Sequence, residues 1–178
     1  MKPWPTKDQR EDLEIRGFIK HYARLPHCRK LDIVERREKP DYFVKDAATG
    51  EYFGVELTSV YLNDRSVPDE HIPPRPAHLF TNGIAYVEAE VDQYKARLLE
   101  AITDKVSKAR RGYDLSYPLI LSIYVNEYRA IFLDTLSEWE LLVRDNDLIF
   151  DNCHPFSEIV FWSLPNDIVF GVRPGKGV

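Results

Sequence analysis

The stretch DYFVKDAATGEYFGVELTSV, residues 41–60, decides the fold of this chain. Runs rich in β-branched and aromatic residues lie on both sides of AATG, residues 47–50, which predicts a β-hairpin. Gly50 is expected to supply a left-handed backbone conformation at the end of the loop. If all four residues form the loop, Asp41 lies directly opposite Glu56 on one face of the hairpin.

Two carboxylates that face each other across a strand pair repel, so this pair predicts a compensating cation. A hard divalent ion such as Mg²⁺ takes carboxylate oxygens as ligands and keeps water molecules, one of which can be activated as a nucleophile. Gly54, on the same face as Glu56, is expected to leave room for a ligand. The alternative is a three-residue loop with a glycine bulge, which shifts the register and sends the two acids to opposite faces.

A long helix is predicted over residues 84–111, with an apolar stripe that contains Lys105 at its centre and Lys108 on its flank. A lysine in such a stripe either extends to solvent or meets an anion, for example a carboxylate or a scissile phosphate. Glu11, in a predicted helix over residues 7–25, also shares a face with apolar side chains. There the alternative is a favourable interaction with the helix dipole.

The remaining segments predict an α/β protein of the α+β type with a mixed sheet. Residues 31–39 are ambiguous between a short strand and an irregular connection, and the proline-rich segment 62–82 predicts a functional loop or flap. The other predicted elements are a buried strand over 118–126, a C-terminal helix over 135–144, and a closing strand pair at 158–164 and 167–172.

The 178-residue length and the 44% hydrophobic content predict one globular domain over residues 1–178. A net charge of −5 argues against a polycation that binds nucleic acid through bulk charge.

No apolar run is long enough to span a membrane and the start lacks a secretory core, so a cytoplasmic location without a membrane partner is expected. Cys28 and Cys153 are expected to be thiols in such a reducing compartment. The motifs of serine hydrolases, P-loop enzymes, Rossmann domains and zinc proteases are missing.

Several of these features together resemble the PD-(D/E)xK nuclease superfamily, which has a restriction-endonuclease-like fold with an αβββαβ core. They are Pro40-Asp41, the hairpin, Glu56-Leu57-Thr58, and Lys105-x-x-Lys108 before strand 118–126. The resemblance covers roughly residues 7–126 and takes residues 31–39 as its first strand. It implies an endonuclease or exonuclease that hydrolyses phosphodiester bonds of nucleic acid, with DNA as the expected partner and Mg²⁺, replaceable by Mn²⁺, as the cofactor. It leaves a homodimer open.

The resemblance also implies a role for each site residue. Its metal ligands would be Asp41, Glu56, the Leu57 carbonyl and, through water, Glu11. Asp41 and Glu56 would be catalytic together with Lys105. The superfamily's usual lysine, two residues after the second acid, is Thr58 here, so Lys105 on the following helix would replace it.

Two alternatives stay open. A catalytically inactive member of the fold would bind nucleic acid or a protein partner, which Thr58 and the acidic net charge favour. If the hairpin register is wrong, the chain is an unrelated α+β protein in which Asp41 is only a turn residue. Binding of Mg²⁺ separates the nuclease from both alternatives.

Overall fold

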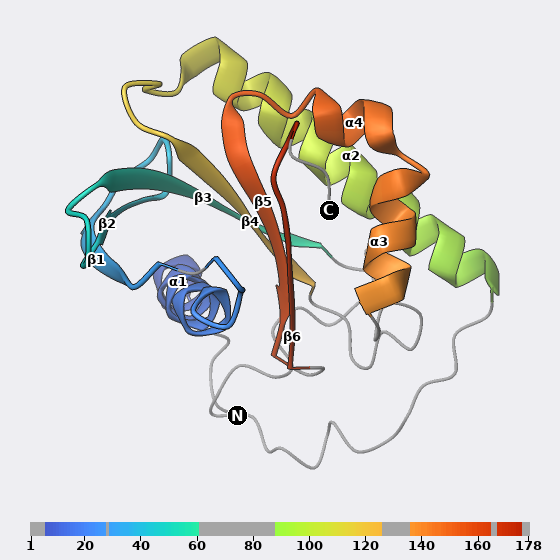
Figure 1. Ribbon diagram of the computed structural model, residues 1–178, viewed down its shortest axis with the longest axis horizontal. Coiled ribbons are helices and arrows are strands. Elements are labelled where there is room, and N and C mark those ends of the chain that lie inside the picture. The colour runs from blue at the N-terminus through green and yellow to red at the C-terminus, as the bar shows by residue number, and fades with distance from the viewer. Residues whose placement is uncertain (1–5, 28, 61–87, 126–135, 165–166, 176–178) are drawn as a thin grey trace.

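The computed structural model describes residues 6–27, 29–60, 88–125, 136–164 and 167–175. The helices and strands in these residues follow in the order α1 (Lys7–Tyr22), β1 (Leu31–Arg36), β2 (Tyr42–Asp46), β3 (Tyr52–Val60), α2 (Glu88–Gly112), β4 (Leu119–Val125), α3 (Leu136–Arg144), α4 (Asp147–Asp151), β5 (Phe156–Ser163) and β6 (Ile168–Val172). The strands form one six-stranded sheet (Figure 1).

The sheet is mixed, and its strands are ordered β1-β2-β3-β4-β5-β6. The pairs β1–β2, β2–β3 and β5–β6 are antiparallel, whereas β3–β4 and β4–β5 are parallel. The predicted α+β class and the closing antiparallel pair are therefore confirmed. The ambiguous segment 31–39 contains strand β1, so the chain from α1 to β4 has the element order αβββαβ.

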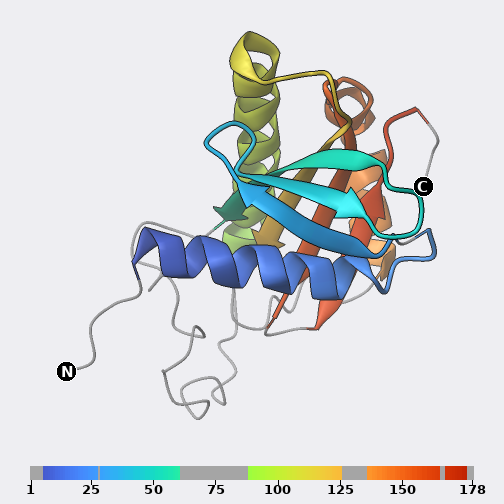
Figure 2. The ribbon, with the colours of Figure 1, turned by 90° about the vertical axis from the view of Figure 1, so that its left-hand side faces the viewer.

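Helices cover both faces of the sheet, as Figure 2 shows with α1 and α2 on opposite sides. One core joins α1 to one face; it includes Ile15, Phe18, Tyr22, Val55, Leu57 and Trp162. The other core joins α2, α3 and α4 to the opposite face; it includes Leu98, Ile102, Leu121, Ile123, Trp139 and Phe161. Strand β4 lies between them and all seven of its residues are buried, as its nearly unbroken apolar sequence predicts.

Three details differ from the sequence-based expectations or fall outside the description. Helix α1 ends at Tyr22, three residues before the predicted end, because the N–H groups of Arg24 and Leu25 bond to carbonyls three residues back and tighten the last turn. The five-residue helix α4 was not predicted, since it is too short to show a helical period. The predicted loop over 62–82 lies outside the described residues. None of the described helices is long and apolar enough to cross a membrane.

Candidate active site

The β2–β3 hairpin has the even register that a four-residue loop predicts. Phe43 pairs with Gly54 and Tyr42 pairs with Val55, so Asp41 and Glu56 are the next opposing positions toward the open end. Gly50 has a φ of 78°, the left-handed conformation expected at the end of the loop. The alternative with a shifted register is therefore wrong, and the two acids share one face.

Asp41 lies just before β2, and its carboxylate crosses to the next strand. Its Oδ2 accepts a hydrogen bond from the backbone N–H of Leu57 at 2.7 Å. The backbone carbonyl of Asp41 accepts a second hydrogen bond, from the N–H of Arg37 at 2.7 Å. These two bonds fix the position of Asp41 beside Glu56.

The expected ligand space at Gly54 is occupied by the protein itself. A Cβ atom on Gly54 would lie 2.5 Å from Cγ of Pro40 and 2.6 Å from Cδ2 of Leu119. Both distances are far below van der Waals contact, so no other residue fits here without displacing its neighbours. Glycine is therefore needed so that Pro40 can pack on β3, and this packing positions Asp41. The expectation of an open ligand space is corrected.

Glu56 is a buried carboxylate in the middle of the sheet, with only 3% of its surface exposed. Strands β2 and β4 flank it, because Leu121 of β4 is its partner on the other side. Its Oε1 accepts a hydrogen bond from Nζ of Lys105 at 2.6 Å. Its Oε2 is buried and has no hydrogen-bond partner among the described residues. A buried anionic oxygen without a partner is costly unless a cation or donor reaches it.

Lys105 comes from the apolar stripe of α2, where the sequence placed it. The stripe faces the sheet, and its members Tyr94, Leu98, Ile102 and Ala109 have no exposed surface. Besides Glu56, the Lys105 ammonium contacts the Leu57 carbonyl at 3.1 Å. Lys108, on the flank, instead pairs with the exposed Asp104 at 2.6 Å. The prediction that Lys105 meets an anion is confirmed, and the alternative that it extends to solvent is wrong.

The two acids are electrostatically linked. Burial, and next the charge of Glu56, raise the pKa of Asp41 to about 6, although the hydrogen bond from Leu57 and the charge of Lys105 act in the opposite direction. A cation bound between the two carboxylates would reduce their electrostatic repulsion.

Tyr113 is a site residue that the sequence reasoning missed. Burial, followed by the neighbouring Glu56 carboxylate, raises the pKa of its hydroxyl, although that hydroxyl does not complete a bond to the unpaired Oε2. Its N–H bonds to the Ala109 carbonyl, so it continues the helical face of Lys105 at four-residue spacing. The four-residue spacing from Lys105 and Ala109 could have identified Tyr113 from the sequence. The predicted helix ended before Gly112, so Tyr113 was not considered.

Glu11 and Glu14 of α1 have different surroundings in the structure. Glu11 forms ion pairs with Arg36 and, at 3.4 Å, with Lys7. It still lies close enough to raise the pKa of Asp41 slightly. Glu14, one turn further along α1, is buried and accepts a hydrogen bond from the Ser59 hydroxyl of β3. The prediction that Glu11 completes a metal shell through water stays a prediction.

The residues at the site fit the kind of Mg²⁺ site that has few protein ligands. The described residues contain no group of three or more His, Cys, Asp or Glu side chains suited to a metal ion. Mg²⁺ commonly uses one or two carboxylates, with substrate phosphate and water as its other ligands. Asp41 and Glu56 supply those two carboxylates, and the unpaired Oε2 of Glu56 is an available oxygen. The Leu57 carbonyl would be a third ligand, but here it accepts from Lys105.

Comparison with known proteins gave no relative: no protein-family model, no curated protein and no solved structure matches the chain. The interpretation of the site therefore rests on its own geometry.

Proposed function

We propose that this chain is a metal-dependent nuclease of the PD-(D/E)xK type that hydrolyses phosphodiester bonds, with DNA as its substrate. The observation that carries the proposal is the 2.6 Å contact between Lys105 Nζ and Glu56 Oε1. It brings an ammonium group from helix α2 to the acid pair of the hairpin, in which Glu56 is buried and Asp41 is partly exposed. Thr58, the position where the superfamily has its lysine, lies on the same face as Glu56, and Lys105 would supply the missing charge from α2, which covers that face.

Each residue has a task that follows from its contacts. Asp41 and Glu56 together would hold Mg²⁺, which supplies positive charge and lowers the pKa of water when bound. The Lys105 side chain is only 19% exposed, so water screens its charge weakly. It is suited to orient a water molecule and to stabilise negative charge that develops on a phosphate oxygen.

The reaction is a hydrolysis that needs no other reactant. The oxygen of a water molecule bonds to phosphorus while the bond from phosphorus to one ester oxygen breaks. The proton of the attacking water passes to bulk water, and the leaving oxygen takes a proton from bulk water. The products are a phosphate monoester and a hydroxyl end.

The direct test is a cleavage assay with single- and double-stranded DNA in Mg²⁺, Mn²⁺ or a chelator. Asp41→Asn and Glu56→Gln should each abolish metal-dependent cleavage, because each removes a ligand and a negative charge. Asp92→Asn and Glu100→Gln, at exposed positions of α2, are matched controls and should cleave like the parent. Equal cleavage by the parent and both site variants would refute the proposal.

The second candidate is a catalytically inactive module of the same fold that binds nucleic acid or a protein. It is favoured by Lys105, which occupies Glu56 Oε1 and the Leu57 carbonyl, two groups that a metal would use. Calorimetric titration with Mg²⁺ separates the two functions. The nuclease should bind Mg²⁺ and lose binding in Glu56→Gln, whereas the inactive module should show no heat that depends on Glu56.

A further inference from the structure

Three aromatic rings lie together at the hairpin, and the two that belong to its strands are on the same face as Glu56. Phe43 of β2 and Tyr52 of β3 have nearly parallel rings, with centroids 5.1 Å apart and an interplanar angle of 9°. Tyr117, just before β4, meets Phe43 edge-on at 4.7 Å and Tyr52 at 6.2 Å. We call Phe43, Tyr52 and Tyr117 the aromatic platform.

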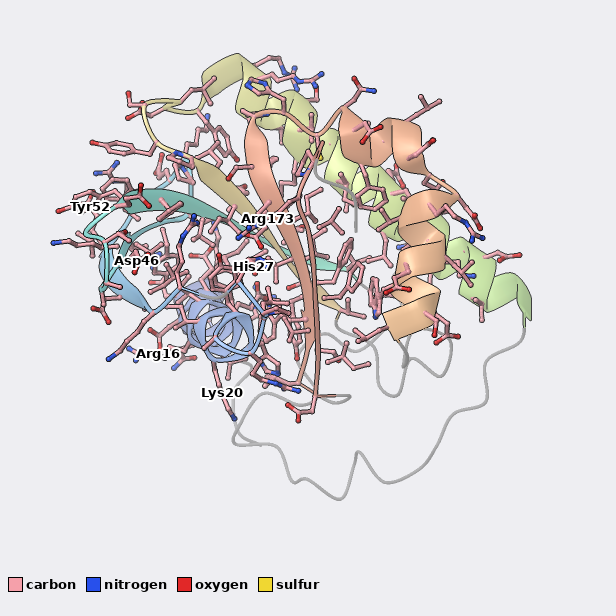
Figure 3. The ribbon with its side chains drawn as sticks, in the orientation of Figure 1. Arg16, Lys20, His27, Asp46, Tyr52 and Arg173 are labelled. Carbon is pink, nitrogen blue, oxygen red and sulfur yellow. The ribbon has the colours of Figure 1, made fainter. Side chains whose placement is uncertain are left out.

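The aromatic platform belongs to neither hydrophobic core. Phe43 is 6% exposed and forms its inner part, whereas Tyr52 and Tyr117 are each 38% exposed. Figure 3 shows Tyr52 at the outer margin of the molecule, beside the start of β3. Large aromatic side chains gain most from burial, so two half-open tyrosines side by side indicate a surface with an external partner.

Two cations accompany the rings. The guanidinium carbon of Arg37 lies 4.1 Å from the Phe43 centroid, and Nζ of Lys45 lies 5.5 Å from the Tyr52 centroid. Arg37 therefore covers one end of the ring stack tightly, while Lys45 covers the Tyr52 end loosely. A lysine has a flexible four-carbon stem, so Lys45 is not a fixed cover over the Tyr52 ring.

The aromatic platform lies on the same face as the acid pair, with Pro40 packed over Gly54 between them. Residues on one face of a strand alternate, so Phe43 follows Asp41 on β2 and Tyr52 precedes Glu56 by four residues on β3. At about 3.3 Å per residue, Tyr52 lies roughly 13 Å along the strand from Glu56. A strand of nucleic acid that rises about 3.4 Å per nucleotide covers that distance within a few nucleotides.

A cavity of about 640 Å³ borders Tyr52 and Tyr117 and extends to Arg29 and Arg173. Its wall also contains three acids, Glu51, Asp151 and Glu158. The charge of this region is therefore mixed, and it would not attract a duplex by charge alone. Stacking on the rings is the stronger attraction that the surface offers.

We propose that the aromatic platform stacks unpaired bases of single-stranded nucleic acid and directs that strand toward Asp41 and Glu56; the second half of this statement rests on the proposed nuclease function. Unpaired bases expose their flat faces, and stacking on aromatic side chains is the common way in which proteins bind them without sequence preference. The paired bases of a duplex have their faces covered, so a duplex does not fit the platform.

The test measures binding alone, in the Asp41→Asn/Glu56→Gln double variant without divalent metal and at physiological salt. Fluorescence anisotropy compares three labelled probes: an oligothymidylate, an abasic oligomer of the same length, and a blunt duplex. The oligothymidylate should bind most tightly. Adding Tyr52→Ala or Tyr117→Ala should weaken its binding by roughly 5- to 150-fold, the range for loss of one stacked base. Binding of the abasic oligomer should change little, because it has phosphates but no bases.

Two further variants separate stacking from damage to the fold. Tyr52→Phe keeps the ring and should bind the oligothymidylate like its parent. Leu148→Ala removes a side chain that is equally apolar but lies on α4 and is 75% exposed, and it should also bind normally. Equal affinity for base-bearing and abasic oligomers, tighter binding of the duplex, or no effect of Tyr52→Ala would overturn the proposal.

Cleavage by the parent protein is measured separately, so the two proposals can fail independently. Preference for unpaired bases without metal-dependent cleavage would refute the nuclease and leave the platform as a binding surface. Cleavage without such a preference would refute the platform and leave the nuclease.

Discussion

The carboxylate of Asp41 accepts a hydrogen bond from the backbone N–H of Leu57, at 2.7 Å, across the open end of the hairpin. This contact uses one oxygen of Asp41 and turns the side chain toward Glu56. An acid at this position would otherwise point away from a like charge. The backbone of β3 therefore holds together two groups that repel each other.

The burial of Asp41, together with its repulsion by Glu56, predicts that Asp41→Asn stabilises the metal-free protein at neutral pH. The folded-state pKa of Asp41 is about 6, above its ordinary 3.8, so ionisation of Asp41 destabilises the fold as pH rises from about 3.8 to 6. Asparagine keeps an oxygen for the Leu57 N–H and has no charge. Calorimetric Tm values should be higher for the variant at pH 8 and nearly equal to those of the parent below pH 4. Mg²⁺ should raise the Tm of the parent more than that of the variant.

Lys105→Met should reduce both turnover and stability. Loss of a contact that stabilises developing charge typically lowers turnover by roughly 10²- to 10³-fold. The substitution also leaves the buried Glu56 carboxylate without its partner, which commonly costs about 3 to 5 kcal/mol. Glu56→Gln in the same chain should recover much of that stability, although not activity. Denaturant unfolding and single-turnover cleavage measure the two effects.

Lys108→Met is the matched control for that experiment. Among the described residues its ammonium pairs with the exposed Asp104, and such surface pairs contribute about 0 to 1 kcal/mol. Stability should therefore change little, and any loss of activity should appear as weaker, salt-dependent binding of nucleic acid. If Lys108→Met lowered turnover as much as Lys105→Met, the special role of Lys105 would be disproved.

Gly54→Ala should destabilise the protein and disturb the site. Its methyl group would overlap Pro40 and Leu119, and overpacking of this kind costs about 1 to 3 kcal/mol. Movement of Pro40 would also displace Asp41, so metal affinity should fall. Gly112→Ala is the control, because nothing lies within 4 Å of the added carbon. Urea unfolding should show a lower free energy of unfolding for Gly54→Ala only. Equal decreases in both variants would contradict the packing explanation.

The burial of His21 predicts that the folded protein becomes less stable in acid. It is buried against Trp162, and burial lowers its pKa below 6.5, with the hydrogen bond to the Gly17 carbonyl opposing this in part. A lowered pKa means that protonation favours the unfolded chain, so stability declines as pH falls below 6.5. The Tm of His21→Gln should depend less on pH between 7 and 5. His154→Gln, at an exposed position, should keep the pH dependence of the parent.

The hairpin and Lys105 were predictable because both depend on short-range periodicity. Alternation of residues along β3 gave the face of Glu56, whereas the choice between a four-residue and a three-residue loop was settled by the structure. The 3.6-residue period of the long helix then placed Lys105 toward the sheet.

The remainder depends on tertiary packing, which local patterns do not contain. Pro40 fills the space over Gly54, whereas the sequence alone suggested open space for a ligand. Glu14 rather than Glu11 contacts β3, because the roll of α1 on the sheet decides which acid is buried. The cluster of Phe43, Tyr52 and Tyr117 joins a hairpin to a residue far along the chain, so no periodicity could have revealed it.

The acid pair and Lys105 come from distant parts of the chain, and this separation affects the order in which they come together during folding. The hairpin that brings Asp41 to Glu56 is a local structure, and hairpins form early because their loops close quickly. The parallel pairing of β3 with β4 and the docking of α2 bring together distant parts of the chain, which is slow. Until α2 docks, the two carboxylates lack the Lys105 ammonium that offsets their repulsion. The chain is therefore expected to complete its core and to bring Lys105 to the acid pair in the same late step.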